Sequence, residues 1–366
     1  VLGDIITAPI QSTNFVAAGN IYPTIAHATG MVVAVAYSVP GSGRLSTFLL
    51  NANGGFVQVG GATPLRNPFN PYSSPVIAPV EGEVYAIPNR NIAPVGVEGF
   101  IDTVRIPADG TALAYLNGPG SFLYDDSLSS QKMIPLDGST RNFALFYTWH
   151  TFAGRAHTFN LSANGLVYTP IASFIFKTSP PRAYDVDAIH IAGNVYAIVY
   201  RTVAGMGTLT TVSIPPDGTT LTIINTLVFE ATGNAQQPHI IPHTGDIYVI
   251  SHTGPLGSEI TTVSISSDGV TLGVINNLPY AGGAPAANSL LHIGNSTMFV
   301  VFHSGWVYTV NISEDGVTLA IYDSNNWVAG TNENTAVRIP GTNIYAHVGN
   351  RGAAGGFLST FRIDSG

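Results

Sequence analysis

One pattern recurs along the whole chain and limits the folds that it can adopt. A threonine begins a run of alternating residues that ends in a glycine seven positions later, and only the last copy is one residue shorter. The copies are Thr47 to Gly54, Thr103 to Gly110, Thr158 to Gly165, Thr211 to Gly218, Thr262 to Gly269, Thr309 to Gly316 and Thr360 to Gly366. Successive threonines are 56, 55, 53, 51, 47 and 51 residues apart. This period is typical of proteins in which each repeat is one supersecondary unit.

Each repeat is expected to form four short strands. A turn and an apolar run around an aromatic residue precede the threonine, as in Gly193 to Ile198. An Asp-Gly or Asn-Gly pair usually ends the run, and it predicts a hairpin with a type I′ turn because such turns need positive φ. In the fifth repeat the strands are expected at 238–243, 246–252, 259–266 and 270–278. β-Branched and aromatic residues dominate these runs, and no helical period persists.

The two ends of the chain indicate how the repeats are arranged. The seventh repeat stops after its third strand, and residues 1–12 precede the first repeat without a repeat of their own. Placed after Gly366, they give a threonine spacing of 53, which is within the observed range. We therefore predict an all-β, seven-bladed β-propeller of four-stranded blades, with the N-terminal strand completing the last blade. An open β-solenoid is the alternative.

The propeller is expected to be a single domain covering residues 1–366. In each blade the first strand should line the central channel and the fourth should form the rim. Loops after strands two and four then share one face, called here the loop face, and the short turns share the other, the tight-turn face. Residues 1–12 are assigned to the outer strand of blade 7, and the blades to 20–66, 72–124, 130–178, 183–230, 235–281, 286–328 and 333–366.

Composition excludes several classes of protein. Charged residues make up 9% of the chain, against about 25% in an average protein, and Lys132 and Lys177 are its two lysines. With a net charge of -8 and no basic stripe, nucleic-acid binding is not expected. The lack of cysteine excludes disulfides and thiolate metal sites. No stretch approaches the ~20 apolar residues of a membrane helix, so membrane insertion is not expected.

Several features favour an exported protein. The chain begins at Val1 without methionine or a signal-like segment, as a processed mature chain would. It is poor in lysine and charge, and three Asn-x-Ser/Thr sequences make Asn160, Asn295 and Asn311 candidate glycosylation acceptors. We expect an extracellular or cell-surface location.

The repeat also resembles a known group of proteins. The phrase from Gly193 to Phe229, a Gly-Asn-Val-Tyr turn and strand followed by a Thr-x-x-x-x-x-x-Gly run, is similar to the tandem propeller repeats of exported bacterial and archaeal surface proteins. The Asp-Gly-x-Thr-Leu turn also resembles turns of surface-layer and lactonase propellers. The resemblance covers all seven repeats and implies architecture, but no site residues. Neither the Gly-His and Trp-Asp signature of WD40 repeats nor the sialidase Asp-box is present.

Residues just beyond strand two of each blade are candidate binding residues on the loop face. They are Tyr37, Arg90, Trp149, His150, Arg201, His252, His303 and Arg351. Such a ring would be weakly cationic and partly aromatic, which suits carboxylate groups and the apolar faces of sugars. The alternative is an ordinary solvated rim. The third repeat departs most from the common pattern, so the region of Trp149 is the best candidate within this ring.

Histidines near the end of strand one are a second candidate set: His27, His190, His243 and His292. If they converge in a narrow channel, their imidazoles could bind a divalent metal, the one cofactor that the sequence suggests. Blades two, three and seven carry Pro79, Leu136 and Arg338 near this position. The alternative is that these histidines line water.

Catalytic signatures are missing from the sequence. It has no Gly-x-Ser-x-Gly elbow, no phosphate-binding loop and no zinc-protease helix. The paired carboxylates are Asp125 with Asp126 and Asp185 with Asp187, while Glu230 and Glu333 are isolated. A carboxylate pair could serve glycoside hydrolysis or, with a metal, lactone opening.

The repeated threonines are expected to be structural. A β-branched residue in strand three can pack between blades while its hydroxyl binds a neighbouring backbone group. We therefore predict a non-enzymatic extracellular propeller that binds a glycan or protein, or that assembles into a surface, virion or filament structure. The alternative is a hydrolase or lyase that acts on a polysaccharide or lactone at the channel mouth.

Overall fold

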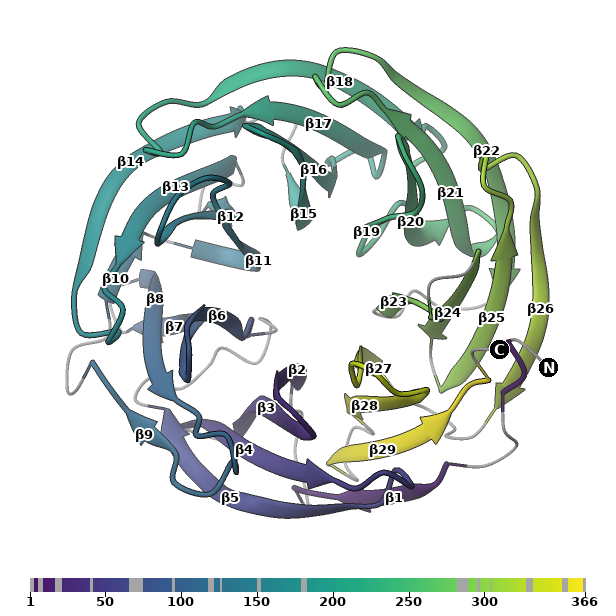
Figure 1. Ribbon diagram of the computed structural model, residues 1–366. Helices are drawn as coiled ribbons and strands as arrows, with labels where there is room; N and C mark the ends of the chain where they lie inside the picture. Colours follow the sequence, from purple (N-terminus) through teal and green to yellow (C-terminus); the bar gives the residue numbers. More distant parts are fainter. Residues whose placement is uncertain are drawn as a thin grey trace.

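A computed structural model describes residues 3–5, 9–16, 22–39, 42–65, 75–93, 96–117, 122–125, 127–149, 153–178, 183–281, 289–294, 297–303, 305–326, 332–350 and 355–364. Side chains of residues 90–93, 96–97, 125, 127–130 and 332–334 are not part of this description. Seven antiparallel sheets surround a central axis, and the described chain contains no helix (Figure 1). The predicted seven-bladed β-propeller is confirmed. No helix of the described chain could therefore cross a membrane.

In blades 1 to 6 the strands follow the chain from the channel outward. Blade 1 contains β2 (Thr24–Thr29), β3 (Val32–Val39), β4 (Ser42–Leu50) and β5 (Phe56–Leu65). Blade 2 contains β6 (Ala78–Glu81), β7 (Val84–Ala93), β8 (Gly96–Arg105), β9 (Ala114–Tyr115) and β10 (Phe122–Asp125). Blade 3 contains β11 (Ser127–Pro135), β12 (Asn142–Trp149), β13 (Gly154–Leu161) and β14 (Tyr168–Lys177).

Blades 4 to 6 have the same order, whereas the outermost strand of blade 7 comes from the N-terminal part of the chain. Blade 4 contains β15 (Tyr184–Ala192), β16 (Val195–Arg201), β17 (Gly207–Ser213) and β18 (Thr222–Glu230). Blade 5 contains β19 (His239–Pro242), β20 (Ile247–Gly254), β21 (Gly257–Ile265) and β22 (Leu272–Ala281). Blade 6 contains β23 (Ser289–His292), β24 (Met298–His303), β25 (Trp306–Ile312) and β26 (Leu319–Asn326). Blade 7 contains β27 (Asn332–Arg338), β28 (Ile344–Asn350), β29 (Gly356–Arg362) and β1 (Gln11–Asn14).

The hydrophobic core lies between the blades. Buried side chains of the described residues form seven clusters, and each joins two adjacent sheets, so that every interface of the ring has one. Strands two and three of a blade supply most of these side chains; β16, for example, buries Tyr196, Ile198 and Tyr200. Fourth strands such as β18 and β22 are mostly exposed. The apolar side chains around the recurring aromatic residue of each repeat therefore pack between neighbouring blades and hold them together.

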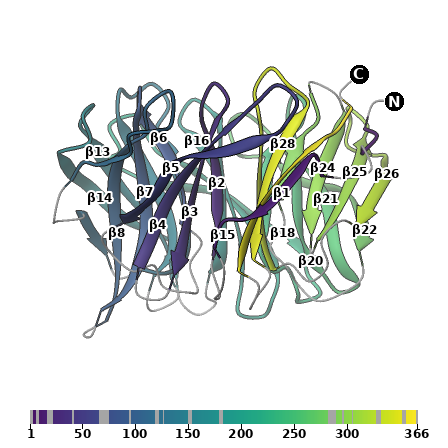
Figure 2. The same cartoon turned by 90° about the horizontal axis from the view of Figure 1, so that it is seen from below.

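The ring is closed as predicted, by pairing of the two ends of the chain. Strand β1 pairs antiparallel with β29, with Gln11 opposite Thr360, and Ile5 forms an isolated bridge with Ile363. The Gln11 side chain also links β1 to blade 1, because its amide donates to the carbonyl of Phe56 at 2.9 Å and accepts from the Phe56 N–H at 2.7 Å. Figure 2 shows the ring edge-on, with both termini at the same face.

Gly3 takes the place of a turn glycine in blade 7. Its φ is +85°, like that of Gly54 at +87°. A Cβ on Gly3 would meet Met298 and Tyr322 of blade 6, as one on Gly316 would meet the equivalent Ile247 and Ile275 of blade 5. The sequence pattern assigned this role to Gly366, which lies outside the described residues.

Six of the seven repeated threonines join their blade to the next. In strand three, a buried threonine hydroxyl donates to the carbonyl of the turn glycine in the following blade. The six bonds are Thr47 to Gly110 at 2.5 Å, Thr103 to Gly165 at 2.6 Å, Thr158 to Gly218, Thr211 to Gly269 and Thr262 to Gly316 at 2.7 Å, and Thr360 to Gly54 at 2.5 Å. The structural role predicted for these threonines is confirmed.

The hairpins that end the threonine runs differ from the predicted type I′ turn. In the turn of blade 5, the N–H of Gly269 donates to the carbonyl of Ser266, which makes the glycine the fourth residue of the turn. Gly269 has a φ of +73°, whereas Asp268 has no positive φ. Asp268 instead accepts from the N–H of Val270 with its side chain. The prediction of a type I′ turn is therefore wrong: only the glycine adopts positive φ, and the aspartate supports the turn by hydrogen bonding.

Candidate functional site

Three polar residues form an arc at the loop-face end of the channel. Lys132, Asp187 and His239 lie on β11, β15 and β19, the innermost strands of blades 3, 4 and 5 (Figure 1). They occupy one register position in their blades. Each pairs with the residue that lies three positions after the recurring aromatic residue of strand two. These pairing partners are Phe146, Val199 and Ser251. Equivalent residues of three successive blades thus meet, and we call them the channel arc.

Asp187 links the three blades of the channel arc. Its Oδ1 lies 2.9 Å from Nζ of Lys132, and its Oδ2 accepts from the N–H of Ile240 at 3.0 Å. Nε2 of His239 lies 3.8 Å from the same Oδ2. The side chains of Lys132 and His239 are 32% and 29% exposed, whereas that of Asp187 is 10% exposed. One of the two lysines of the chain is therefore committed to a largely buried ion pair beside the channel.

The protonation states of the arc follow from its burial and charges. Burial alone would raise the pKa of Asp187, but the charge of Lys132 and the hydrogen bonds from Lys132 and Ile240 hold it below its usual range. Burial lowers the pKa of His239, and the opposing effect of the Asp187 charge is smaller. At neutral pH the arc therefore presents an ammonium, a carboxylate and a neutral imidazole.

A second ion pair lies beside the arc and joins β15 to β16 of blade 4. Nε of Arg201 donates to Oδ2 of Asp185 at 3.0 Å, and the guanidinium lies 5.0 Å above the ring of Tyr184. The backbone N–H of Gln237 also donates to Oδ2 of Asp185, at 3.3 Å. Asp185 and Gln237 have φ values of +54° and +48°, and they are the two positive-φ residues other than glycine in the described chain. Strained residues cluster at functional sites, and here the two are hydrogen-bonded to each other.

The same register position has a structural role elsewhere in the ring. In blade 6, Ser289 Oγ accepts from the N–H of Ala336 in blade 7 at 3.1 Å. In blade 7, Thr335 donates to the carbonyl of Pro23, beside blade 1, at 3.0 Å. The position therefore joins neighbouring innermost strands, and ionisable side chains occupy it in blades 3 to 5.

The structure describes part of the predicted loop-face ring. The side chain of Arg90 and all of His150 and Arg351 lie outside the described residues. Tyr37 is buried, with its hydroxyl 3.2 Å from Oγ of Ser46. Among the described members, then, fewer reach the surface than the ring pattern suggested.

The remaining members contact their own or an adjacent blade. The Arg155 guanidinium lies 3.6 Å above the ring of Trp149. His303 is buried against Ser258 of blade 5, with its Nδ1 3.0 Å from the serine Oγ. The fully buried His252 joins Glu230 and Glu259. Arg201 is the member that the structure places next to the channel arc.

The four predicted channel histidines do not form one cluster. His27 and His190 each bind the carbonyl of the glycine in their own hairpin, at 2.9 and 2.8 Å. His243 and His292 are neighbours, with ring centroids 6.3 Å apart, and their Nε2 atoms lie 2.9 and 2.6 Å from backbone carbonyls. A metal site made of all four is therefore a prediction without supporting geometry.

The structure reveals one group of potential metal ligands that the sequence pattern did not indicate. Glu230, His252 and Glu259 are all buried, and one ligand atom of each lies within 4.8 Å of the others. Glu230 was isolated in the sequence, and His252 was assigned to the loop-face ring. Glu259 had no assigned role, because only the register of β20 and β21 places it opposite His252. The side chains of Asp125 and Glu333, and all of Asp126, lie outside the described residues.

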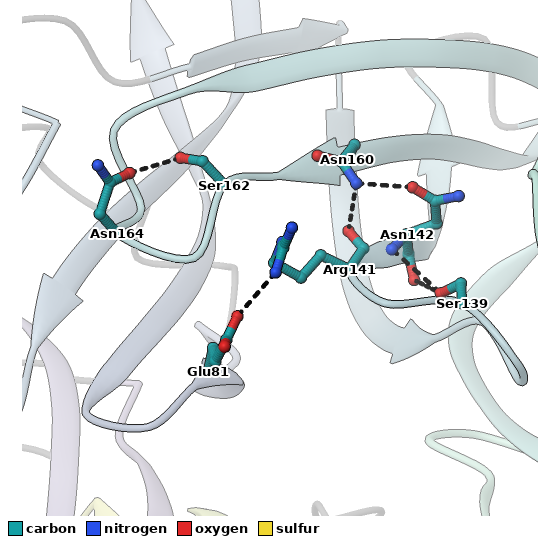
Figure 3. A network of polar contacts seen from close by, with 7 residues as sticks. All are labelled: Glu81, Ser139, Arg141, Asn142, Asn160, Ser162 and Asn164. Atoms are coloured by element: carbon teal, nitrogen blue, oxygen red, sulfur yellow. Dashed lines mark hydrogen bonds and ion pairs between the residues drawn. The ribbon is translucent and has the colours of Figure 1, made fainter.

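A polar network on the tight-turn face concerns the predicted glycosylation acceptor Asn160. Its Nδ2 donates to the carbonyl of Arg141 at 3.2 Å and to Oδ1 of Asn142 at 2.8 Å (Figure 3). Arg141 in turn pairs with Glu81 of blade 2 at 3.0 Å. An N-glycan replaces one hydrogen of this Nδ2, so attachment would break one of the two bonds. Glycosylation of Asn160 in the folded protein is thus disfavoured.

Comparisons with known proteins give the fold but no family. No family model and no curated protein matches the sequence. The crystal structure of a "putative 6-phosphogluconolactonase" from Bacteroides fragilis matches with a TM-score of 0.61 and 13% identity over 84% of this chain and 83% of that one. A second such protein, from Bacteroides uniformis, matches with a TM-score of 0.58 and 12% identity over 80% of each chain.

A third solved structure comes from a different class of propeller. The WD40 domain of coronin from Toxoplasma gondii matches with a TM-score of 0.54 and 12% identity, over all of this chain and 89% of that one. At these identities the similarity shows the fold alone. The narrower resemblance to exported surface propellers stays a prediction.

Proposed function

We propose that the protein binds a carbohydrate-class ligand at the channel mouth over blades 3 to 5, without transforming it. The observation that carries the proposal is the channel arc, in which a chain with few charges places an ammonium, a carboxylate and an imidazole side by side. Asp187 is held in its ionised form by Lys132 and Ile240, which suits a hydrogen-bond acceptor rather than a general acid.

The chemistry of the site favours a ligand with many hydroxyl groups. A sugar hydroxyl both donates and accepts, and here donors on Lys132 and Arg201 lie beside acceptors on Asp187 and Asp185. The charges of these two pairs cancel, so no strongly anionic ligand is required.

The proposed setting is outside the cell, supported by the scarcity of charge and lysine. A protein ligand, or assembly of copies of this chain, belongs to the same non-enzymatic class. Binding to a glycan array, together with size-exclusion chromatography, separates these cases from one another.

A hydrolase or lyase acting on a polysaccharide or lactone is the second candidate. One observation favours it: the neutral imidazole of His239 lies 3.8 Å from the carboxylate of Asp187, as in a base with an orienting acid. The fold shared with the two Bacteroides proteins described as 6-phosphogluconolactonases is compatible with this alternative.

The proposal is tested with three variants and a glycan array. Lys132→Met, Asp185→Asn and Asp187→Asn each remove one charge from the mouth, and Asp187→Asn keeps an oxygen that can accept from Ile240. We expect each to weaken binding of the array-selected glycan by about 10-fold or more, the loss of one charge-assisted hydrogen bond. Isothermal titration measures the dissociation constants, and circular dichroism confirms that the variants are folded.

A matched variant controls for general effects of breaking an ion pair. Glu83→Gln breaks the Arg105–Glu83 pair of the tight-turn face, 2.8 Å long, and should leave glycan affinity unchanged. Binding that survives Lys132→Met and both aspartate changes would refute the site. Release of product from the bound glycan, abolished by Asp187→Asn, would instead establish the hydrolase alternative.

A further inference from the structure

A buried group of three ionisable side chains lies between blades 4 and 5, apart from the channel arc. Glu230 is the last residue of β18, while His252 and Glu259 face each other in register on β20 and β21. Their exposed fractions are 7%, 0% and 3%. One oxygen or nitrogen of each lies within 4.8 Å of those of the other two. The group thus has the spacing of ligands around a single ion.

The group holds two carboxylates without a matching side-chain cation. Among the described residues, no lysine or arginine forms an ion pair with Glu230 or Glu259. Buried carboxylates are costly unless a positive charge or hydrogen bonds compensate them. Both carboxylates accept hydrogen bonds, from Thr232 and Asn277, and a positive charge from outside the chain or a shared proton would complete their compensation.

Each glutamate has one oxygen held in place and one available. Oε1 of Glu230 accepts from the N–H of Thr232 at 2.6 Å, and Oε2 of Glu259 accepts from Nδ2 of Asn277 at 2.8 Å. In the described part of the chain, nothing donates to Glu230 Oε2 or Glu259 Oε1. Each of these two buried residues thus keeps one acceptor oxygen for a ligand, and outer residues orient both carboxylates.

The imidazole of His252 is oriented in the same way. Its Nδ1 lies 3.1 Å from the carbonyl of Thr253, which can only accept, so the proton belongs on Nδ1. Nε2 then carries the lone pair and accepts from the hydroxyl of Thr261, 2.8 Å away, so a bound ion would replace this hydrogen bond. A histidine that donates one ring N–H to a backbone carbonyl and offers the other nitrogen is the usual arrangement of a metal ligand.

We propose that Glu230, His252 and Glu259 bind one divalent transition-metal ion between blades 4 and 5. One nitrogen and two carboxylate oxygens match the ligand preferences of Zn²⁺, with Mn²⁺ bound more weakly, whereas Ca²⁺ and Mg²⁺ favour oxygen ligands alone. Because the ligands come from two sheets, the ion would cross-link adjacent blades.

Zinc titration of chelator-treated protein tests the site. Isothermal titration should give one ion per chain, and the thermal midpoint should rise with Zn²⁺ until saturation. Glu230→Gln and His252→Gln should each weaken zinc binding by at least about 10-fold, the lower range for loss of even an outer-sphere partner. Without metal, the thermal midpoint of Glu230→Gln should be no lower than that of the parent protein, because the change removes the repulsion between two neighbouring carboxylates.

Two exposed asparagines provide a matched pair that does not disturb the core. Asn277→Ala removes the donor to Glu259 and should weaken zinc binding by about 10-fold. The adjacent Asn276 donates to the carbonyl of Val317 in blade 6, so Asn276→Ala should leave zinc affinity unchanged. Zinc-soaked crystals should show an anomalous peak about 2.0–2.2 Å from atoms of all three ligands.

Two results would overturn the proposal. One is zinc affinity that Glu230→Gln and Asn277→Ala leave intact. The other is a double variant, His243→Gln with His292→Gln, that loses zinc binding while Glu230→Gln keeps it. That result would show that the ion binds at the channel histidines instead.

Discussion

At the scale of single residues, the side chain that repeats most faithfully serves the ring rather than a ligand. The strand-three threonine is fully buried in blades 1, 2, 3, 4, 5 and 7, and there its hydroxyl donates to a glycine carbonyl of the next blade. Thr309 in blade 6 is equally buried, but its hydroxyl has no hydrogen-bond partner among the described residues. The next blade forms the corresponding turn from the two chain ends instead of from one hairpin.

This difference provides a test within the same protein. Thr211→Val keeps the shape of the side chain but leaves the buried carbonyl of Gly269 without its donor, so it should lower the free energy of unfolding by about 1–3 kcal/mol. Thr309→Val should change it by less than about 0.5 kcal/mol. Urea unfolding of both variants decides the matter; equal losses would show that the hydroxyls contribute nothing specific.

At the scale of strands, the sequence pattern predicted the regular elements well and the irregular ones poorly. The alternation around Thr262 correctly placed β21 and β22, because burial on one face fixes the register of a strand. The outer strand of blade 2 is instead split into β9 and β10. Next to β9, the side chain of Asn117 takes part in pairing with β8, accepting from the N–H of Thr103 and donating to the carbonyl of Ile101. When a side chain replaces the backbone in strand pairing, the sequence shows no periodic pattern from which the pairing could be predicted.

Strand β1 is the element whose removal should matter most. Deleting residues 1–12 would expose the edge of β29 and remove Ile5 and the double hydrogen bond from Gln11 to Phe56. We expect a loss of about 5 kcal/mol and a thermal midpoint lower by roughly 10 °C. The exposed edge should also promote concentration-dependent association, visible by light scattering. An unchanged melting curve would contradict the role of β1 in closing the ring.

At the scale of the whole molecule, the fold could be predicted but the candidate site could not. Seven similar repeats and the unmatched residues 1–12 determine a closed ring, since each sheet must bury both faces against neighbours. The channel arc depends instead on which residue of the short first strand faces Phe146, Val199 or Ser251. Bulges in β11 and β15 shift this register, and no sequence signal marks them.

Buried histidines should make the stability of the whole protein depend on pH. Burial lowers the pKa of His303 to about 4 and that of His347 to about 3. Both groups are neutral in the folded state, while in the unfolded chain they take up a proton near pH 6.5. Their stabilising contribution is therefore complete above pH 6.5 and is lost as the pH falls toward 4. Each should cost about 2 kcal/mol between pH 7 and pH 5.

The measurement is urea unfolding of the parent protein and His347→Gln at pH 7 and pH 5. The variant should lose about 2 kcal/mol less than the parent over this interval, whatever its stability at pH 7. The same pH dependence in both proteins would show that His347 titrates normally in the folded state.

The place where the two chain ends meet determines how this protein is oriented when it is attached to a support. The N–H of Gly3 donates to the carbonyl of Asp364 at 2.7 Å. The two chain ends lie at the tight-turn face (Figure 2). A bead, sensor surface or neighbouring module attached at either end would lie beneath that face. The channel arc of blades 3 to 5 lies toward the opposite, loop face, so it would point away from the anchor and into the solvent.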